Sequence, residues 1–196
     1  MYPSIVFPAD TPVAVEMTAK HAKRYLEWFR TVLPERIALL ESEVRKDVVG
    51  SDWKADFTPG SLRQLGAWFV SKVATEVCEP VPVILHERTI ASINYKLTGE
   101  TYSRSFDAGI YFGEILTRAD PRFKWEIRTK GSRRNMDFGH LVIPGLTGGV
   151  CNPVRLLVMI AHGTVQGASH IGPGRLFELY YFRIEDLSES ERPQDD

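Results

Sequence analysis

Hydrophobic residues in the first third of the chain recur mostly at helical spacing. Aromatic and aliphatic residues at that spacing predict a helix from Thr18 to Leu33, with Trp28 and Phe29 facing inward. Pro34 lacks the backbone N–H that an interior helical position requires, so we expect a break there. A second helix would then run to Val48 and form an antiparallel or angled pair with the first.

Three further segments before residue 117 have helical features. Ser61 is a suitable N-cap for a third helix, because apolar residues follow it at helical spacing. The stretch Ile84–Leu97 mixes apolar and charged residues, and we interpret it as a helix. The segment Ser105–Leu116 is apolar on most faces, which predicts a central and mostly buried helix.

The period of the pattern changes after Pro121. Phe123, Trp125 and Ile127 alternate with charged residues, as in a half-buried strand. Residues 130–135 predict a turn, and residues 138–143 predict the returning strand. Because a hairpin of two strands is marginally stable alone, we expect it to pack on the helices or to gain another strand.

The last third of the sequence predicts two more helices. Asn152 followed by Pro153 is a strong helix start, since asparagine caps and proline suits the first helical position. That helix would cover 154–166, and a final one would cover 175–187. The sequence therefore predicts an α+β fold, mainly helical, with one β-hairpin or small antiparallel sheet packed on the central apolar helix.

We expect a single globular domain over residues 1–196. Residues 1–17 carry three prolines and predict an extended segment lying over the core. Residues 188–196 predict a flexible acidic tail, within a C-terminal stretch, 185–196, that holds six acids and one arginine.

Composition excludes several classes of protein. Of the 196 residues 43% are apolar, and 24 Lys and Arg balance 25 Asp and Glu to a net charge of −1. A disordered chain and a generally basic nucleic-acid binder are excluded. Two cysteines are too few for a disulfide scaffold. No charged leader or long apolar run is present, so we expect a cytoplasmic protein without a membrane partner.

One stretch resembles a known group of proteins. The run Gly109–Leu116, then Trp125 on a strand, then a hairpin, then Asn152-Pro153 and an apolar helix, is similar to uncharacterised bacterial helix–hairpin–helix domains. Some of these are associated with polymorphic-toxin immunity or secretion loci. The resemblance covers roughly residues 100–167. It implies a helix–hairpin–helix core and carries over no catalytic residue.

Candidate catalytic residues are Asp107, Glu114 and His162. The two carboxylates stand seven apart on one helix and share a face, which would let them divide acid and base roles with a histidine. A structural role is the competing interpretation, in which Arg118, four residues after Glu114, neutralises it. Glu114 needs a partner in either case, because an unpaired buried charge is costly.

The sequence predicts neither a metal nor a cofactor. None of the five histidines lies in an H-E-x-x-H motif, and there is no C-x-x-C pair. A Cys151–His162 dyad stays open as a nucleophile and base. Gly109 and Gly113 predict close approach of another helix or of the hairpin over the central helix, so leucine at either position should destabilise the fold.

Charge is distributed unevenly. Residues 118–134 hold seven cations against two acids, a local balance of +5, and most of them would decorate the hairpin and its turn. Such a ribbon can dock on an acidic protein or enter a nucleic-acid groove. The residues we expect to bind a partner are Arg122, Lys124, Arg128, Lys130, Arg133 and Arg134.

We therefore expect a non-enzymatic bacterial protein that binds another protein, with an immunity or accessory role in a toxin or secretion system as the specific form. Two alternatives stay open. One is an enzyme that uses Glu114 and Asp107 with a histidine, and the other is nucleic-acid binding through the basic segment.

Overall fold

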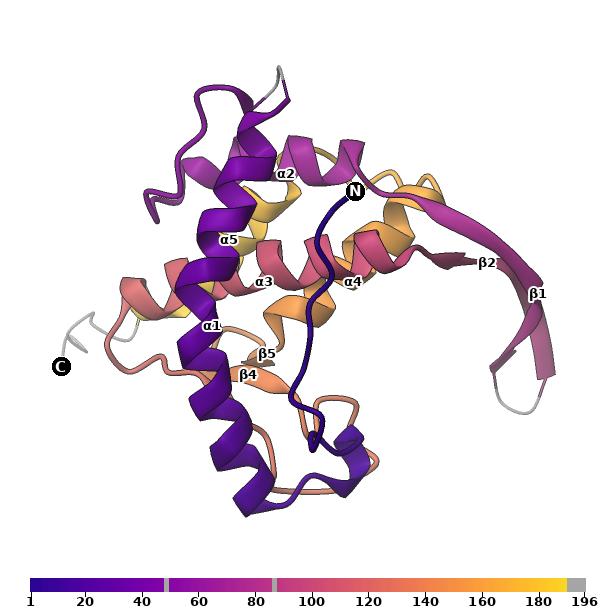
Figure 1. Cartoon of the computed structure of the whole chain (residues 1–196), viewed down its shortest axis with the longest axis horizontal. Helices are drawn as coiled ribbons and strands as arrows, with labels where there is room; N and C mark the ends of the chain where they lie inside the picture. Colours follow the sequence, from indigo (N-terminus) through magenta and orange to yellow (C-terminus); the bar gives the residue numbers. More distant parts are fainter. Residues whose placement is uncertain (48–49, 86–87, 190–196) are drawn as a thin grey trace, which may run out of the picture.

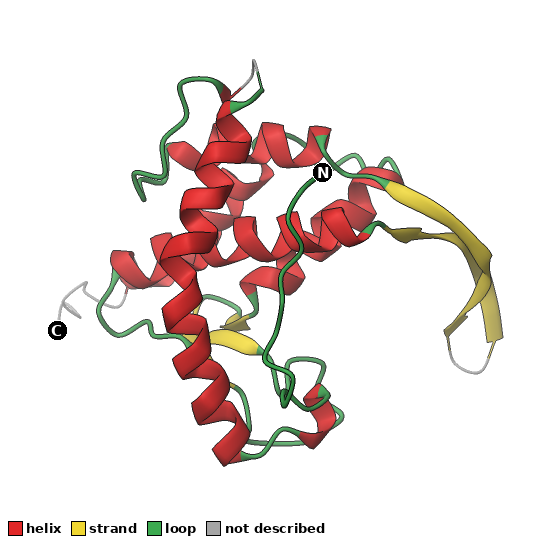
Figure 2. Ribbon diagram, in the orientation of Figure 1, coloured by secondary structure: helices red, strands yellow, loops and turns green. Residues whose placement is uncertain are grey.

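The fold is α+β, as the sequence predicts, and helices make up half of it. The computed structural model describes residues 1–47, 50–85 and 88–189. Within them five α-helices accompany a two-stranded hairpin and a three-stranded antiparallel sheet (Figures 1 and 2). The helices are α1 (Ala19–Arg45), α2 (Ser61–Ser71), α3 (Gly99–Ala119), α4 (Pro153–Val165) and α5 (Arg175–Glu189).

Helix α3 lies at the centre of the fold. Thirteen of its 21 residues are buried, which confirms the predicted central helix. Side chains of α1, α2, α4 and α5 all enter the main hydrophobic cluster with those of α3. A second, smaller cluster joins α1 and α3 to Ile127 and Leu141 of the small sheet.

Helix α1 runs unbroken through Pro34, so the predicted break and helix pair are wrong. The reason is the buried stripe on its inner face. Phe29, Ile37, Leu40 and Val44 lie on one continuous side of the helix and are all buried. Burying such side chains contributes roughly 1.5–3 kcal/mol each, which together exceeds the cost of about 3 kcal/mol for one interior proline.

The segment that we interpret as a helix over 84–97 is instead part of a long hairpin. Strand β1 (Thr75–Leu85) pairs antiparallel with β2 (Arg88–Leu97). Pro80 and Pro82 lie inside β1, where an edge strand tolerates them and a helix would not. The hairpin projects from the helical body as an arm (Figure 1).

The basic segment forms less sheet than expected. Strand β3 is only Glu126–Ile127, and it pairs with β4 (Leu141–Leu146), which in turn pairs with β5 (Gly149–Cys151). The connection from 128 to 140 consists of turns and is no β-ribbon. Strand β5 is the additional strand that a marginal hairpin requires, and it falls in the glycine segment before α4.

The N-terminal segment is extended, apart from one 3-10 turn at Ala14–Glu16, and it crosses the body in Figure 1. Its Tyr2 is buried in the main cluster, so the segment lies over the core as predicted. Helix α4 begins as expected, with the Asn152 side chain accepting a hydrogen bond from the Arg155 N–H. Residues 190–196 of the predicted acidic tail lie outside the described residues.

No helix in the described part of the chain is long and apolar enough to cross a membrane.

Candidate functional site

An apolar groove of about 320 Å³ lies between the N-terminal segment, α1, and the first half of α4. We call it the α4 groove. Most of its lining is aromatic or aliphatic, and three polar side chains stand at its rim. The lining residues are Phe7, Tyr25, Phe106, His140, Leu141, Asn152, Val154, Arg155 and Val158.

Aromatic packing builds one wall of the groove. The ring of Phe7 lies 5.5 Å from that of Trp28 and 5.9 Å, edge-on, from that of Phe106. The N–H of Ile5 donates to Ser103 of α3 at 3.3 Å, which holds this part of the N-terminal segment in place. Phe7 nevertheless stays half exposed, because its outer side faces the open groove.

On one side of the groove, the polar side chains at the rim already have hydrogen-bond partners within the protein. Arg155 donates to Asp137 at 2.7 Å, and the Asn152 amide donates to the same oxygen at 3.1 Å. Partial desolvation lowers the pKa of His140, so its imidazole is neutral at pH 7. The rim therefore offers a neutral histidine and an already paired arginine, which leaves the groove itself without net charge.

The predicted basic residues separate into two sets. Arg122 donates to Asp120 at 2.7 Å, and Arg118 lies 3.6 Å over the Phe57 ring while it approaches Glu114 at 3.7 Å. In contrast, no ion pair with a described acid involves the other five predicted partner residues. These are Lys124, Arg128, Lys130, Arg133 and Arg134.

Four of those five cations lie in residues 128–134, which we call the basic loop. The loop leads directly through residues 135–139 into His140 and Leu141, which line the α4 groove. The Arg128 backbone anchors both ends of this connection, because its N–H donates to the His140 carbonyl and its carbonyl accepts from the Gly139 N–H. A positive loop thus adjoins an apolar groove.

The candidate catalytic carboxylates have different surroundings. Asp107 is fully buried and accepts two hydrogen bonds from Arg36 and one from Tyr2, each of 2.6–2.7 Å. Glu114 accepts from the Trp125 indole at 2.8 Å and meets Arg118, which confirms the predicted i,i+4 pair.

His162 lies 3.4 Å from the Tyr95 hydroxyl at the base of the arm. Asp107, Glu114 and His162 each bond to other residues rather than to one another, and none of the three lines the α4 groove. Within the described residues, no group of three or more His, Cys, Asp or Glu side chains could hold a metal ion. Asp107 and Glu114 thus have the contacts of structural polar groups, whereas His162 lines a separate cavity of about 370 Å³ together with His170.

Burial governs the chemistry of Cys151. The side chain is 1% exposed, and this burial raises the pKa of the thiol to about 11. The reactive form is the thiolate, so only about one thiol in a thousand would be reactive at pH 8. Such a thiol is a poor nucleophile for a Cys151–His162 dyad.

We expect a thiol-specific disulfide reagent at pH 8 to label one cysteine quickly in the native protein. Cys78 is partly exposed on the arm, whereas Cys151 should react only as fast as the protein unfolds. A Cys78→Ser variant should therefore show almost no rapid labelling. Rapid labelling of that variant would mean that Cys151 is accessible and activated.

Sequence reasoning did not find the α4 groove. The composition of α4 does give an indication of the groove. The helix is apolar along almost its whole length, yet only four of its 13 residues are buried. Val154 and Val158 pack against the two hydrophobic clusters with one side and line the groove with the other. The opposite wall comes from residues 1–17, which no local pattern connects to α4.

No family model, curated protein or solved structure matches this chain.

Proposed function

We propose that this chain is a non-enzymatic protein-binding protein, and that its α4 groove takes an acidic segment of a partner protein. The apolar side chains of that segment would fill the groove, and its carboxylates would pair with the basic loop. The observation that carries the proposal is the contiguity of an apolar groove with cations that have no described acidic partner.

Charge complementarity favours an acidic protein segment as the occupant. The walls of the groove are apolar, so they suit aliphatic or aromatic anchors that become buried on binding. The basic loop is joined to the groove lining by the backbone hydrogen bond from Arg128 to His140, and its cations would steer an acidic partner and fix its orientation. A nucleic acid would use the loop and leave the apolar walls without a role.

An immunity or accessory role in a bacterial toxin or secretion system is the finer form of this proposal, and it rests on the resemblance of residues 100–167. Both cysteines are free thiols, which suits the cytoplasm as the proposed compartment.

Selection from a random peptide library displayed on phage tests the proposal, because the library samples many sequences and the partner itself need not be identified. We expect selected peptides to combine Asp or Glu with aromatic or aliphatic residues. Val158→Glu should weaken binding of a selected peptide at least about tenfold, since it places a charge in the groove. Met159→Glu controls for an added charge on α4, because Met159 is the next residue, is 61% exposed and lies outside the groove. Since Val158 also packs against the core, thermal unfolding of Val158→Glu must show that the variant stays folded at the temperature of the binding measurement.

Charge reversal tests the other half of the proposal. Arg133→Glu with Arg134→Glu should weaken the same peptide and reduce the dependence of its affinity on salt. If no peptide is selected, or if Val158→Glu has no effect, the groove does not bind a protein segment. Salt-sensitive binding of a DNA duplex that survives Val158→Glu would favour the nucleic-acid alternative.

A further inference from the structure

The arm formed by β1 and β2 stands apart from the rest of the fold. Its strands pack chiefly on each other, and Figure 2 shows the arm projecting from the helices. Hairpins of two strands are marginally stable in water unless a third strand or a helix supports them. A ribbon of this length that is held out into solvent therefore needs another partner for most of its surface.

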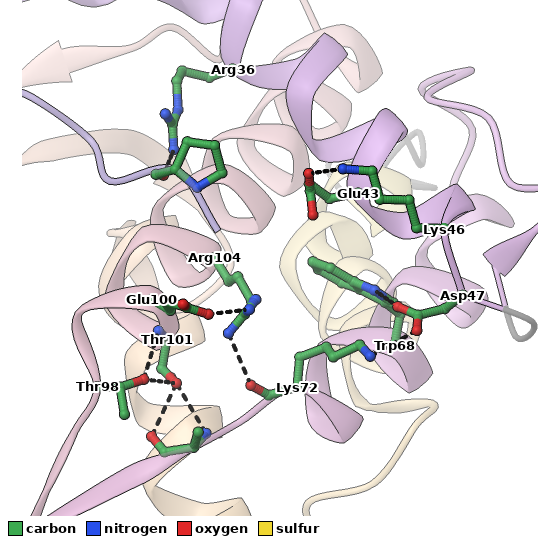
Figure 3. A network of polar contacts seen from close by, with 12 residues as sticks. Arg36, Glu43, Lys46, Asp47, Trp68, Lys72, Thr98, Glu100, Thr101 and Arg104 are labelled. Carbon is green, nitrogen blue, oxygen red and sulfur yellow. Dashed lines mark hydrogen bonds and ion pairs between the residues drawn. The ribbon is translucent and has the colours of Figure 1, made fainter. Parts of the chain in front are cut away.

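The base of the arm is fixed firmly. Thr101 of α3, labelled in Figure 3, donates its hydroxyl to the Ala74 carbonyl and accepts from the Ala74 N–H, each at 3.0 Å. The Thr98 N–H donates to the same carbonyl. On the other side, the Tyr95 ring packs on His162 of α4 and its hydroxyl accepts from Gln166. The arm thus leaves the body in a defined direction.

One face of the arm is apolar at the described positions. Val77 lies opposite Tyr95 and Val81 lies opposite Ile93. Val77 is 90% exposed and Val81 58% exposed, which is unusual for valines in a strand. Glu76 and Lys96 form an ion pair at another cross-strand position, on the opposite face. The exposed valines indicate that this face of the arm is open for contact with another molecule.

The two edges of the arm differ in their capacity to pair. Strand β1 carries Pro80 and Pro82 and an irregularity between Val77 and Val81, and each proline removes a donor from its ladder. Such features block the outer edge of a strand against further pairing. Strand β2 contains no proline from Arg88 to Leu97, so its outer edge is the one open to a further strand.

We propose that the open edge of β2 pairs with β2 of a second copy of this chain, antiparallel about a twofold axis. The order of strands would be β1-β2-β2-β1. A chain with one open edge can add one neighbour only, so the association stops at a dimer and forms no fibre. A second copy also supplies an unpaired strand with the same alternation of faces, which would extend the apolar face across four strands.

This dimer is independent of the proposed groove. The arm contacts the C-terminal part of α4 through His162 and Gln166, whereas the groove uses Val154 and Val158 near its start. Substitutions in the arm therefore test the dimer without altering the groove.

Sedimentation equilibrium at micromolar concentrations is the first test. We expect a species of twice the 22.2 kDa chain mass in equilibrium with monomer. Asn94→Pro should shift that equilibrium to monomer, because it removes a donor from β2. Asn94 is a suitable position since it lies opposite the β1 irregularity and has no register partner there. Glu79→Pro, in the same irregular part of β1, is the matched control and should leave the dimer intact.

Cysteine cross-linking tests the geometry. In a Cys78→Ser background, single cysteines at 93, 94, 95 and 96 should cross-link most strongly at one position near the twofold axis, because disulfides need Cα atoms within about 7 Å. Cysteine at Val77 or Val81 should cross-link weakly. The proposal is overturned if the protein stays monomeric, if Asn94→Pro leaves a dimer unchanged, or if the β1 cysteines cross-link best.

Discussion

Replacing Asp107 with alanine will lower the free energy of unfolding by about 3–5 kcal/mol, because it leaves the Arg36 guanidinium buried without its counter-charge. The Pro3 carbonyl, at 3.2 Å, is the acceptor that Arg36 would keep. The buried Tyr2 hydroxyl loses its carboxylate acceptor as well. Urea denaturation of the variant and of the native protein measures the difference.

A double variant distinguishes the effect of removing the whole ion pair from the effect of leaving one buried charge without its partner. Arg36→Met combined with Asp107→Leu removes both ions and replaces them with apolar side chains, so it should recover most of the lost stability. If Asp107→Ala is instead as stable as the native protein, the ion pair has no structural importance and a catalytic role for Asp107 regains weight.

The same variant should also affect the α4 groove. Tyr2 and Pro3 hold the start of the N-terminal segment against α1 and α3 through Arg36 and Asp107. Four residues after Pro3, Phe7 forms a wall of the groove. We therefore expect Asp107→Ala to expose this segment to proteolysis and to weaken a selected peptide, even at temperatures where the body of the protein stays folded.

Leucine at Gly109 will destabilise the protein by more than about 3 kcal/mol, because it overpacks a close contact between α3 and α4. Even a single Cβ at Gly109 would lie 2.7 Å from the Val154 Cα and 2.9 Å from the Pro153 carbonyl oxygen. Both are backbone atoms, so the helices themselves would have to separate. Thermal unfolding followed by circular dichroism measures the effect.

Gly99→Ala on the same helix is the control for that measurement. Nothing lies within 4 Å of a Cβ at Gly99, and alanine restricts the unfolded chain more than glycine does. We expect this variant to be unchanged or more stable by up to about 1 kcal/mol. If Gly109→Leu matched Gly99→Ala in stability, α3 and α4 would not approach as closely as described.

The close-approach role of both glycines follows from the sequence pattern and is confirmed in the fold. At Gly113 the neighbour is the Trp125 ring, just before β3, and at Gly109 it is the start of α4. A small residue repeated every four positions marks a helix face that has no room for side chains. The pattern could not say which element fills the space, since that depends on packing between distant segments.

The basic segment, residues 118–134, shows what local sequence patterns cannot predict. Its positive charge is readable from the sequence, but its division into paired and unpaired cations is not. Arg122 finds Asp120 two residues away, and Arg118 finds the Phe57 ring from another part of the chain. The contrast with Arg133 and Arg134, which form no ion pair with an acid of the described chain, became visible only with the fold.

The sequence by itself determined the central helix α3, the start of α4 at Asn152, and the α+β class, because these depend on local periodicity and capping. The tertiary structure decided the rest. It carried α1 through Pro34, since the buried stripe outweighs one lost hydrogen bond. It also gave β1 and β2 their pairing, and it brought Phe7 to α4, because such contacts join residues that no local pattern links.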